Sequence, residues 1–278
     1  MKMDYDYSKI DNYDELRKLQ LTQLEILKFV DKFCKDNGIK YSIAYGTMLG
    51  AVRHGGFIPW DDDMDIFMLR DDYNKFIDLW KNTDKYLLQN HNTDKDFTQS
   101  FSKIRKKNTA FVQQADVGKK YHKGIFIDIF PLDRVPNGRI SRYMQMFHAM
   151  KYNLFMRGYP PKNGGIMTFA SNIILKTTKK SNYEKKIAKN LKKICKYNSD
   201  SGLKLADMAV FETIKSPYSA DFMNKIIYYD YEDTKVMMSA EYIKFLETYF
   251  GDYMQLPPES EQTWFHHPVA IDFDKEYE

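Results

Sequence analysis

The 278-residue chain carries 42 basic and 38 acidic residues, so its net charge of +4 gives no argument for a nucleic-acid partner. Hydrophobic residues make up 43% and aromatic residues 15% of the chain, which excludes long disorder. Two cysteines, Cys34 and Cys195, exclude a disulfide framework and fit a reducing cytosol. The N-terminal stretch is too acidic for a secretory signal, and no apolar run approaches the about eighteen residues of a membrane span. We therefore expect a cytoplasmic protein.

Apolar residues at helical spacing predict a long amphipathic helix that begins at YDELRKLQ and ends at Gly38. The next stretch, IKYSIAYGT, predicts a strand that runs into a tight turn at Gly46, with a short helix after the turn. A second strand is predicted over MDIFML, and a second short helix over RDDYNKFIDLWKNT.

Further along, FTQSFSKIRKKNTAF predicts a strand pair or a strand and a turn. The stretch GIFIDIFPLDRVP predicts a buried strand that is broken by Pro131. Helical patterns dominate from about residue 139 onward. The order of elements therefore predicts an α/β (α+β) fold whose later part is mostly helical.

Four aspartates (Asp61, Asp62, Asp63 and Asp65) occupy five consecutive positions in the stretch GFIPWDDDMDIFM. Like charges this close raise one another's pKa and oppose compaction unless a positive partner lies among them. A solvated turn does not suit the apolar flanks, and an EF-hand calcium loop would need Gly where Ile66 stands. The stretch therefore predicts a divalent-metal site.

Two further features support a metal and phosphate site. Strand alternation places Asp63 and Asp65 on one face, where their oxygens suit Mg²⁺. Asp128 is a lone carboxylate inside the apolar strand FIDIF, where it needs a partner, either a metal or a structural one. The turn at Gly46 and Thr47 opens a helix and predicts backbone amides that hold phosphate oxygens, although most such turns bind nothing.

Three motifs, YGTMLGAVRHGGFIPWDDDMDIFM, FIDIFPLDRVP and YFGDYMQLPP, resemble the LicD family of phosphorylcholine transferases, which includes the fukutin-related proteins. The resemblance covers roughly residues 24–267. It implies a nucleotidyltransferase-like mixed sheet and the transfer of phosphocholine from its CDP conjugate to a sugar hydroxyl. The acidic motif of the family falls on Asp61, Asp63 and Asp65, and its later acid on Asp128. With only two cysteines, no structural zinc site is carried over.

The resemblance also suggests how the chain is divided. Residues 1–138 would form the nucleotidyltransferase-like catalytic core with its N-terminal helix. Residues 139–278 would form a mostly helical acceptor-binding part, packed on the core as one unit.

Phosphoryl transfer depends mostly on positioning and on charge neutralisation by metal ions. We expect one or two Mg²⁺ ions, with Mn²⁺ as a substitute, on Asp63, Asp65 and Asp128, the three catalytic residues. Asp61 would be a ligand or would orient one, and Asp62 is predicted to be exposed. Asp128 or another group would accept the proton of the acceptor hydroxyl.

Basic residues near these acids are candidates for binding the donor. Arg53 and His54 lie between the turn and the acids and would reach the diphosphate, with a structural role for Arg53 as an equal alternative. Lys103 and Arg105 are predicted to share a strand face and to neutralise the leaving CMP.

Choline recognition would require an aromatic cage, because a quaternary ammonium gains mainly from ring quadrupoles. The candidates for the cage are Trp60, Tyr121, Tyr253 and Trp264, each of which is alternatively a core residue. His266 would line the site or simply pack.

Residues 175–196 contain nine Lys and one Glu, and no nucleic-acid motif accompanies them. They are either a solvated helix face or a surface that contacts anionic membrane. Membrane contact would suit a lipid-linked acceptor and a peripheral position at the inner face of the cell membrane.

The sequence thus favours an Mg²⁺-dependent phosphotransferase that uses CDP-choline, modifies a lipid-linked or soluble glycan precursor of teichoic acid or lipopolysaccharide type, and releases CMP. One alternative is a nucleotidyltransferase that uses an NTP and releases pyrophosphate. Another is a protein that binds a metal or ligand without catalysis. Three separate carboxylate positions beside a phosphate-type turn favour an enzyme over the last alternative.

Overall fold

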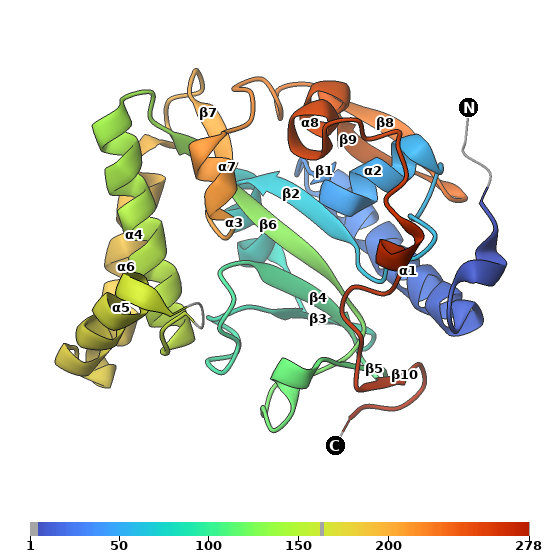
Figure 1. Cartoon of the computed structure of the whole chain (residues 1–278), viewed down its shortest axis with the longest axis horizontal. Coiled ribbons are helices and arrows are strands. Elements are labelled where there is room, and N and C mark those ends of the chain that lie inside the picture. Colours follow the sequence, from blue (N-terminus) through green and yellow to red (C-terminus); the bar gives the residue numbers. More distant parts are fainter. Residues whose placement is uncertain (1–4, 162–163, 278) are drawn as a thin grey trace. The chain divides into compact units, whose positions relative to one another are not determined.

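The computed structural model describes residues 5–161 and 164–277 and shows a mixed α/β fold, which confirms the predicted fold class (Figure 1). The α-helices are α1 (Tyr13–Asp36), α2 (Tyr45–Arg53), α3 (Arg70–Leu79), α4 (Arg139–Arg157), α5 (Gly165–Thr177), α6 (Tyr183–Ile194), α7 (Phe211–Lys215) and α8 (Tyr242–Phe250). The strands are β1 (Ser42–Ile43), β2 (Asp65–Leu69), β3 (Tyr86–Gln89), β4 (Ser102–Lys106), β5 (Ala110–Val112), β6 (Phe126–Val135), β7 (Lys204–Asp207), β8 (Ile226–Tyr231), β9 (Thr234–Ser239) and β10 (Ala270–Asp272). Among the helices described, none is both long and apolar enough to cross a membrane.

The contacts within the chain define two compact units. Unit 1 comprises the described residues of Met1–Gln89, Lys103–Phe130 and Phe222–Glu278, and unit 2 comprises Asn90–Ser102 and Pro131–Asp221. The C-terminal segment therefore belongs to the same unit as the N-terminal helix. The expected division into a core of residues 1–138 and a helical part of residues 139–278 stays a prediction, because the two compact units do not test it.

Unit 1 is built on a sheet with the strand order β1-β2-β6-β4-β3. β1 and β2 are antiparallel, with Ser42 opposite Phe67, and β3 and β4 are antiparallel, with Leu88 opposite Ile104. The backbone N–H of Asp128 on β6 donates to the carbonyl oxygen of Met64 at 2.9 Å. This bond places the lone acid of β6 beside the start of β2.

The long helix α1 buries an apolar stripe that includes Leu16, Leu19, Leu27 and Val30. The helix ends before Gly38, whose φ of +60° is a conformation that glycine adopts at little cost. The predicted helix is thus confirmed from start to stop.

The hairpin of β8 and β9 belongs to unit 1, and a carboxylate at its turn binds two other segments of that unit. Glu232, between the two strands, binds Arg17 of α1 at 2.6 Å and accepts the N–H of Phe57 at 3.1 Å. A Cβ on Gly56 would lie 2.2 Å from the Glu232 carboxylate, so a larger residue there would force this side chain to move.

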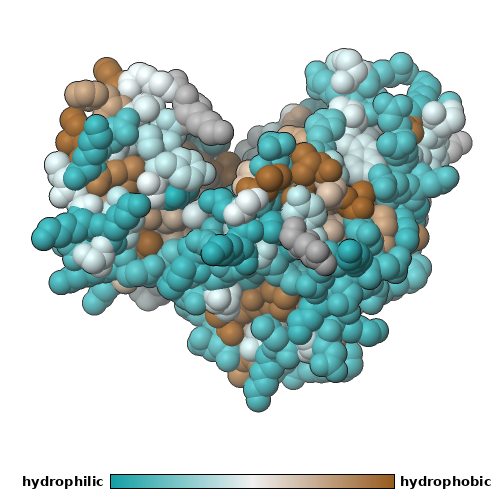
Figure 2. Space-filling model, turned by 90° about the horizontal axis from the view of Figure 1, so that it is seen from below, coloured by the Kyte–Doolittle hydropathy of each residue, from teal (hydrophilic) through white to brown (hydrophobic). Residues whose placement is uncertain are grey.

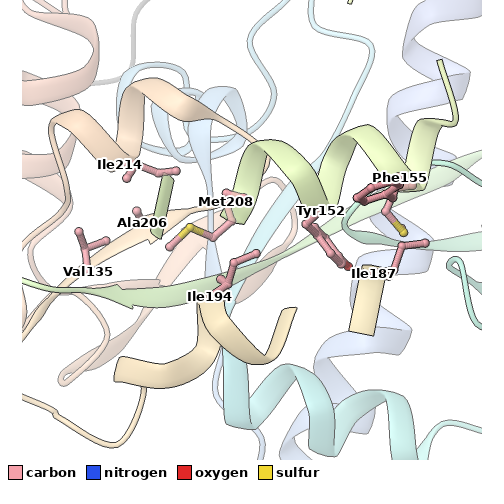
Figure 3. Close-up of a cluster of buried hydrophobic side chains, with 10 residues drawn as sticks. Val135, Tyr152, Phe155, Ile187, Ile194, Ala206, Met208 and Ile214 are labelled. Carbon is pink, nitrogen blue, oxygen red and sulfur yellow. The ribbon is translucent and has the colours of Figure 1, made fainter. Parts of the chain in front are cut away.

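Unit 2 packs its helices and β7 around the second half of β6. Figure 3 shows its buried apolar cluster, in which Tyr152 and Phe155 of α4 meet Ile187 and Ile194 of α6. Hydrophobic side chains also reach the surface of the α4 to α6 segment, at the left in Figure 2.

The prediction that Pro131 breaks its strand is wrong. β6 runs from Phe126 to Val135, and all of its residues are buried. Leu132–Val135 pairs antiparallel with β7, so Pro131 stands immediately before this pairing begins. A strand tolerates proline where the missing N–H does not interrupt the ladder.

The stretch around residues 97–111 was predicted as a strand pair or a strand and a turn. It does contain two strands, β4 and β5. β4 pairs with β3, the strand before it in the chain, whereas β5 pairs with β10 near the C-terminus, so the two strands do not pair with each other.

Candidate active site

The predicted strand–turn–helix around Gly46 is present and lies against the acidic segment. Gly46 and Thr47 are in the first turn of α2, directly after β1. A Cβ on Gly46 would lie 2.8 Å from Oδ2 of Asp61, so a larger residue there would displace this carboxylate. The hydroxyl oxygen of Thr47 accepts the backbone N–H of Asp65 at 2.9 Å. The start of α2 and the acidic segment thus form one site.

Buried amides of α1 hold the main chain of the acidic segment in place. Nε2 of Gln20 donates to the carbonyl oxygen of Asp61, and Nε2 of Gln23 donates to that of Asp62, both at 2.9 Å. Both glutamines are buried. Sequence reasoning missed these residues, although two glutamines on the apolar stripe of α1 were a signal.

The acidic side chains of the segment repel one another. Burial raises the pKa of Asp61 and of Asp65 well above the ordinary value, and the charge of Asp63 raises both further. Burial also raises the pKa of Asp63, and the charges of Asp62 and Asp128 add to this effect. β2 begins only at Asp65, so Asp63 precedes the strand, yet the two side chains still interact.

Asp128 on β6 forms a buried ion pair. Its Oδ1 accepts from Nζ of Lys103 at 2.6 Å, and the same ammonium lies 3.2 Å from the centre of the Phe126 ring. Burial and the charge of Arg105 lower the pKa of Lys103 in spite of this pairing. Lys103 therefore lies against Asp128, whose charge acts on Asp63 and Asp65.

Arg105 lies on the same face of β4 as Lys103, as predicted. Its guanidinium carbon is 4.9 Å from the centre of the Phe126 ring that Lys103 also contacts. The guanidinium donates to Oε1 of Gln89 at 2.6 Å and to the carbonyl oxygen of Gly124 at 2.7 Å. These bonds make Arg105 part of the frame that carries the site.

The prediction that Asp62 is exposed is wrong. Asp62 is 0% exposed, and its carboxylate accepts the backbone N–H of His266 at 2.9 Å and bonds Nδ1 of that residue at 3.0 Å. The same Nδ1 is 3.8 Å from Oδ2 of Asp63. Burial alone would lower the pKa of His266, but the bond to Asp62 and the charge of Asp63 raise it. The C-terminal segment thereby brings His266 into the site.

Arg53 and His54 form internal contacts in the structure. Nη1 of Arg53 donates to the carbonyl oxygens of Tyr253 and Gln255 at 3.0 and 3.1 Å, and Nε donates to Nε2 of His54 at 2.9 Å. Burial and the charge of Arg53 lower the pKa of His54 to about 4. The structural alternative for Arg53 is therefore observed, and binding of a diphosphate stays a prediction.

The aromatic cage candidates have structural contacts of their own. Trp60 packs against Tyr5 at 5.3 Å between ring centroids, the hydroxyl of Tyr121 donates to Asp116 at 2.6 Å, and Nε1 of Trp264 donates to the main chain at 3.2 Å. Tyr253 is half-buried beside the bond from Arg53. These contacts agree with the core alternative for Trp60 and Trp264, and the cage stays a prediction.

The buried hydroxyl of Tyr231 is a further group near the acids. Among the residues that the structure describes, it has no hydrogen-bond partner. Burial raises the pKa of Tyr231 well above its ordinary value, and the charges of Asp61 and Asp63 add to the rise. An unpaired polar atom beside repelling carboxylates fits a site that takes a cation and its water.

The described residues include no group of three or more His, Cys, Asp or Glu side chains already placed around a metal position. The acids supply the carboxylate oxygen atoms that Mg²⁺ prefers, and their charges call for a cation. The donor set therefore fits a divalent ion, although side chains would have to turn to surround it.

Comparison with known proteins shows the class to which this fold and site belong. The LicD/FKTN/FKRP family, nucleotidyltransferase domain, matches residues 38–195, which include Gly46, the acidic segment, Lys103 and Asp128. The match covers more than half of the chain, and the chain therefore belongs to the LicD family.

A particular relative extends the match over nearly the whole chain. The lipopolysaccharide cholinephosphotransferase LicD of Haemophilus influenzae is 31% identical over 261 residues, which are 90% of this chain and 96% of the relative. Uncharacterized proteins of Rickettsia typhi and Rickettsia prowazekii are 40% and 41% identical, each over 23% of this chain and over 21% and 24% of their own lengths.

We predict that Asp62→Ala lowers the free energy of unfolding by about 1–3 kcal/mol, because it leaves the half-buried N–H of His266 without its acceptor. Urea unfolding measures the change. Asp84→Ala, at an exposed aspartate, is the control and should change stability by no more than about 0.5 kcal/mol. Equal effects of the two substitutions would show that the bond to His266 does not stabilise the fold.

We also predict that His54 makes stability depend on pH. Its pKa is about 4 in the folded chain and about 6.5 when unfolded, so the unfolded state binds the proton first as pH falls. The contribution of His54 is fully present above pH about 6.5 and is lost progressively down to about 4. The stability of His54→Gln should therefore fall less than that of wild type between pH 7 and 5 in denaturant titrations, and parallel curves would contradict the assignment.

Proposed function

We propose that this chain is a cholinephosphotransferase that moves phosphocholine from CDP-choline to a hydroxyl of a glycan acceptor and releases CMP, with Mg²⁺ as cofactor. The observation that carries the proposal is the set of half-buried and buried acids Asp61, Asp63 and Asp65, whose charges act on one another and which lie against the start of α2. A cholinephosphotransferase similar over 90% of the chain supports the choice of phosphocholine.

Asp61, Asp63, Asp65 and Asp128 would hold the ion. When bound, Mg²⁺ would supply positive charge to the diphosphate and to the oxygens of the reacting phosphorus. Mn²⁺ is expected to replace it, because both ions accept carboxylate oxygens.

The residues of the chain would position the other groups. The acceptor oxygen attacks the phosphorus that carries choline, the bond from that phosphorus to the bridging oxygen of CMP breaks, and the hydroxyl proton moves to Asp128. Lys103, at 2.6 Å from Asp128, would then donate to the phosphate of the departing CMP. His266 would fix the orientation of Asp62 and, through it, of the acidic segment.

The acceptor is proposed to be a lipid-linked or soluble glycan of lipopolysaccharide or teichoic acid type. Exposed lysines at residues 185, 189, 192 and 193 project from α6, whose opposite side buries Ile187 and Ile194. This one-sided charge supports peripheral contact of residues 175–196 with anionic lipid at the inner face of the cell membrane. If residues 175–196 are instead a solvated helix face, the protein should show no detectable binding to lipid.

We predict that Mg²⁺ stabilises wild type and has much less effect on Asp65→Asn. At 100 times its Kd a ligand adds about 2.7 kcal/mol to the free energy of unfolding. Without metal, Asp65→Asn should be more stable than wild type, because it removes one buried charge from a repelling set. Chemical unfolding with and without Mg²⁺ measures both effects, with Asp84→Asn as control. Equal stabilisation of both proteins by Mg²⁺ would exclude Asp65 as a ligand.

We predict that CMP is the nucleotide product. The protein is incubated with Mg²⁺ and with CDP-choline, CDP-ribitol or CTP, and nucleotides are separated by chromatography. CMP should form from CDP-choline and decrease at least about 100-fold in Asp65→Asn, since loss of a metal ligand removes several kcal/mol of charge stabilisation. Pyrophosphate from CTP, with CDP-choline intact, would favour the nucleotidyltransferase alternative. No product from any donor would favour a protein without catalysis.

A further inference from the structure

Helix α5 presents an apolar stripe that the described chain does not cover. None of its residues is buried, and Ile166, Phe169 and Ile173 are 88%, 68% and 47% exposed. Their spacing of three and four residues places them on one side of the helix. Single exposed apolar residues are ordinary, but a continuous stripe of large ones marks an interaction surface.

The adjoining side of α5 is anchored to unit 2. Ile174 and Leu175 pack against the buried cluster of that unit, and the hydroxyl of Tyr183 donates to the carbonyl oxygen of Leu175 at 3.4 Å. The stripe is therefore held outward by packing at the end of the helix. Hydrophobic side chains on this part of the surface are visible at the left in Figure 2.

The charged residues next to α5 in the sequence are all basic. Between Asp133 and Glu184 the sequence contains no Asp or Glu. Lys176, Lys179 and Lys180 follow the stripe directly and are exposed. The first acid, Glu184, is bonded to His91 at 2.9 Å and to Lys95 at 3.2 Å, so its charge is compensated. The stripe thus has cations beside it, which complements an anionic surface.

The same combination recurs on α4. Ile140, Tyr143, Met144 and Phe147 fall on one side of that helix and are 82%, 59%, 51% and 46% exposed. The first three line a groove of about 1050 Å³ whose charged lining residues include Arg139, Lys193 and Lys196. Apolar side chains next to cations are therefore a property of this whole segment of unit 2.

The length of α5 decides how it would meet a bilayer. At about 1.5 Å per residue its 13 residues extend about 20 Å, which is shorter than the about 30 Å hydrocarbon layer. A short helix with one apolar side and nearby lysines lies in the plane of the interface.

We propose that α5 is an in-plane membrane anchor that inserts Ile166, Phe169 and Ile173 among the acyl chains of an anionic bilayer, while Lys176, Lys179 and Lys180 contact lipid phosphates. This inference rests on the proposed membrane contact of residues 175–196 and deepens it. A charged face alone would bind electrostatically, whereas α5 adds a hydrophobic contribution that salt does not screen.

Tryptophan fluorescence of Phe169→Trp tests insertion directly. The native Trp60, Trp80 and Trp264 are each at most 9% exposed, so a new exposed indole gives a separate signal. Vesicles of phosphatidylglycerol and phosphatidylcholine should shift its emission to shorter wavelength, and lipids brominated on their acyl chains should quench it. Emission that stays that of a water-exposed indole on fully bound protein would overturn the proposal.

A pair of variants separates insertion from electrostatic contact. Ile166→Gln with Phe169→Gln should reduce sedimentation with these vesicles at about 1 M salt at least tenfold, since two apolar side chains are lost and surface charge is screened over about 3 Å. Ile243→Gln, at an exposed apolar residue of α8, is the matched control and should bind as wild type does. Replacing Lys185, Lys186, Lys192 and Lys193 by Gln should weaken binding at low salt only. Equal binding by the α5 variant and wild type at high salt would overturn insertion.

Two further readouts keep this proposal distinct from the proposed function. Release of CMP with a soluble acceptor should be unchanged in all of these variants, because none touches the carboxylate site. A chain that inserts into vesicles but releases no CMP would retain the anchor and refute the transferase. A dimer in solution that the α5 double variant dissociates, without any vesicle-induced shift of the indole emission, would instead assign the stripe to a second copy and overturn the anchor.

Discussion

Mutual repulsion of buried carboxylates is the constraint on which the architecture of unit 1 depends. The charge of Asp63 raises the pKa of Asp61 and of Asp65, and Asp128 on the neighbouring strand raises that of Asp63 and of Asp65. Lys103 compensates one acid directly, through its 2.6 Å bond to Asp128. The repulsion among the remaining charges destabilises the fold, and hydrogen bonds from several segments hold the main chain of the acidic segment in spite of it. Such a concentration of charge is expected at a functional site.

Contacts between segments that are distant in sequence hold that site in place. Arg53 binds the carbonyl oxygens of Tyr253 and Gln255, Asp62 binds His266, and Arg17 binds Glu232. Each of these contacts joins the N-terminal part of unit 1 to its last segment. The C-terminal residues thus help to hold the candidate site, although Glu232, the nearest of them, lies 167 positions after Asp65 in sequence.

The elements that could be predicted from the sequence are those determined by neighbouring residues in the chain. The helix that ends at Gly38, the strand and turn before α2 and the acidic stretch follow from periodicity, glycine and charge, and they are confirmed as elements. The burial of Asp62 and the strand through Pro131 were predicted wrongly, because each depends on a partner supplied from elsewhere: His266 for Asp62, and β7 beside Pro131. Strand partners such as β10 for β5 likewise have no local signal. Ligand geometry at the acids remains a prediction for the same reason.

The hydrogen bonds from Gln20 and Gln23 reach only the peptide oxygens of Asp61 and Asp62. These two bonds do not hold the carboxylates of Asp61 and Asp63, whose rotamers can change while the main chain keeps its place. Binding and release of an ion here would therefore require side chains to rotate, and would not require a loop to open. An ion that bound at such a site would not impose the loss of chain entropy that ordering a mobile segment costs.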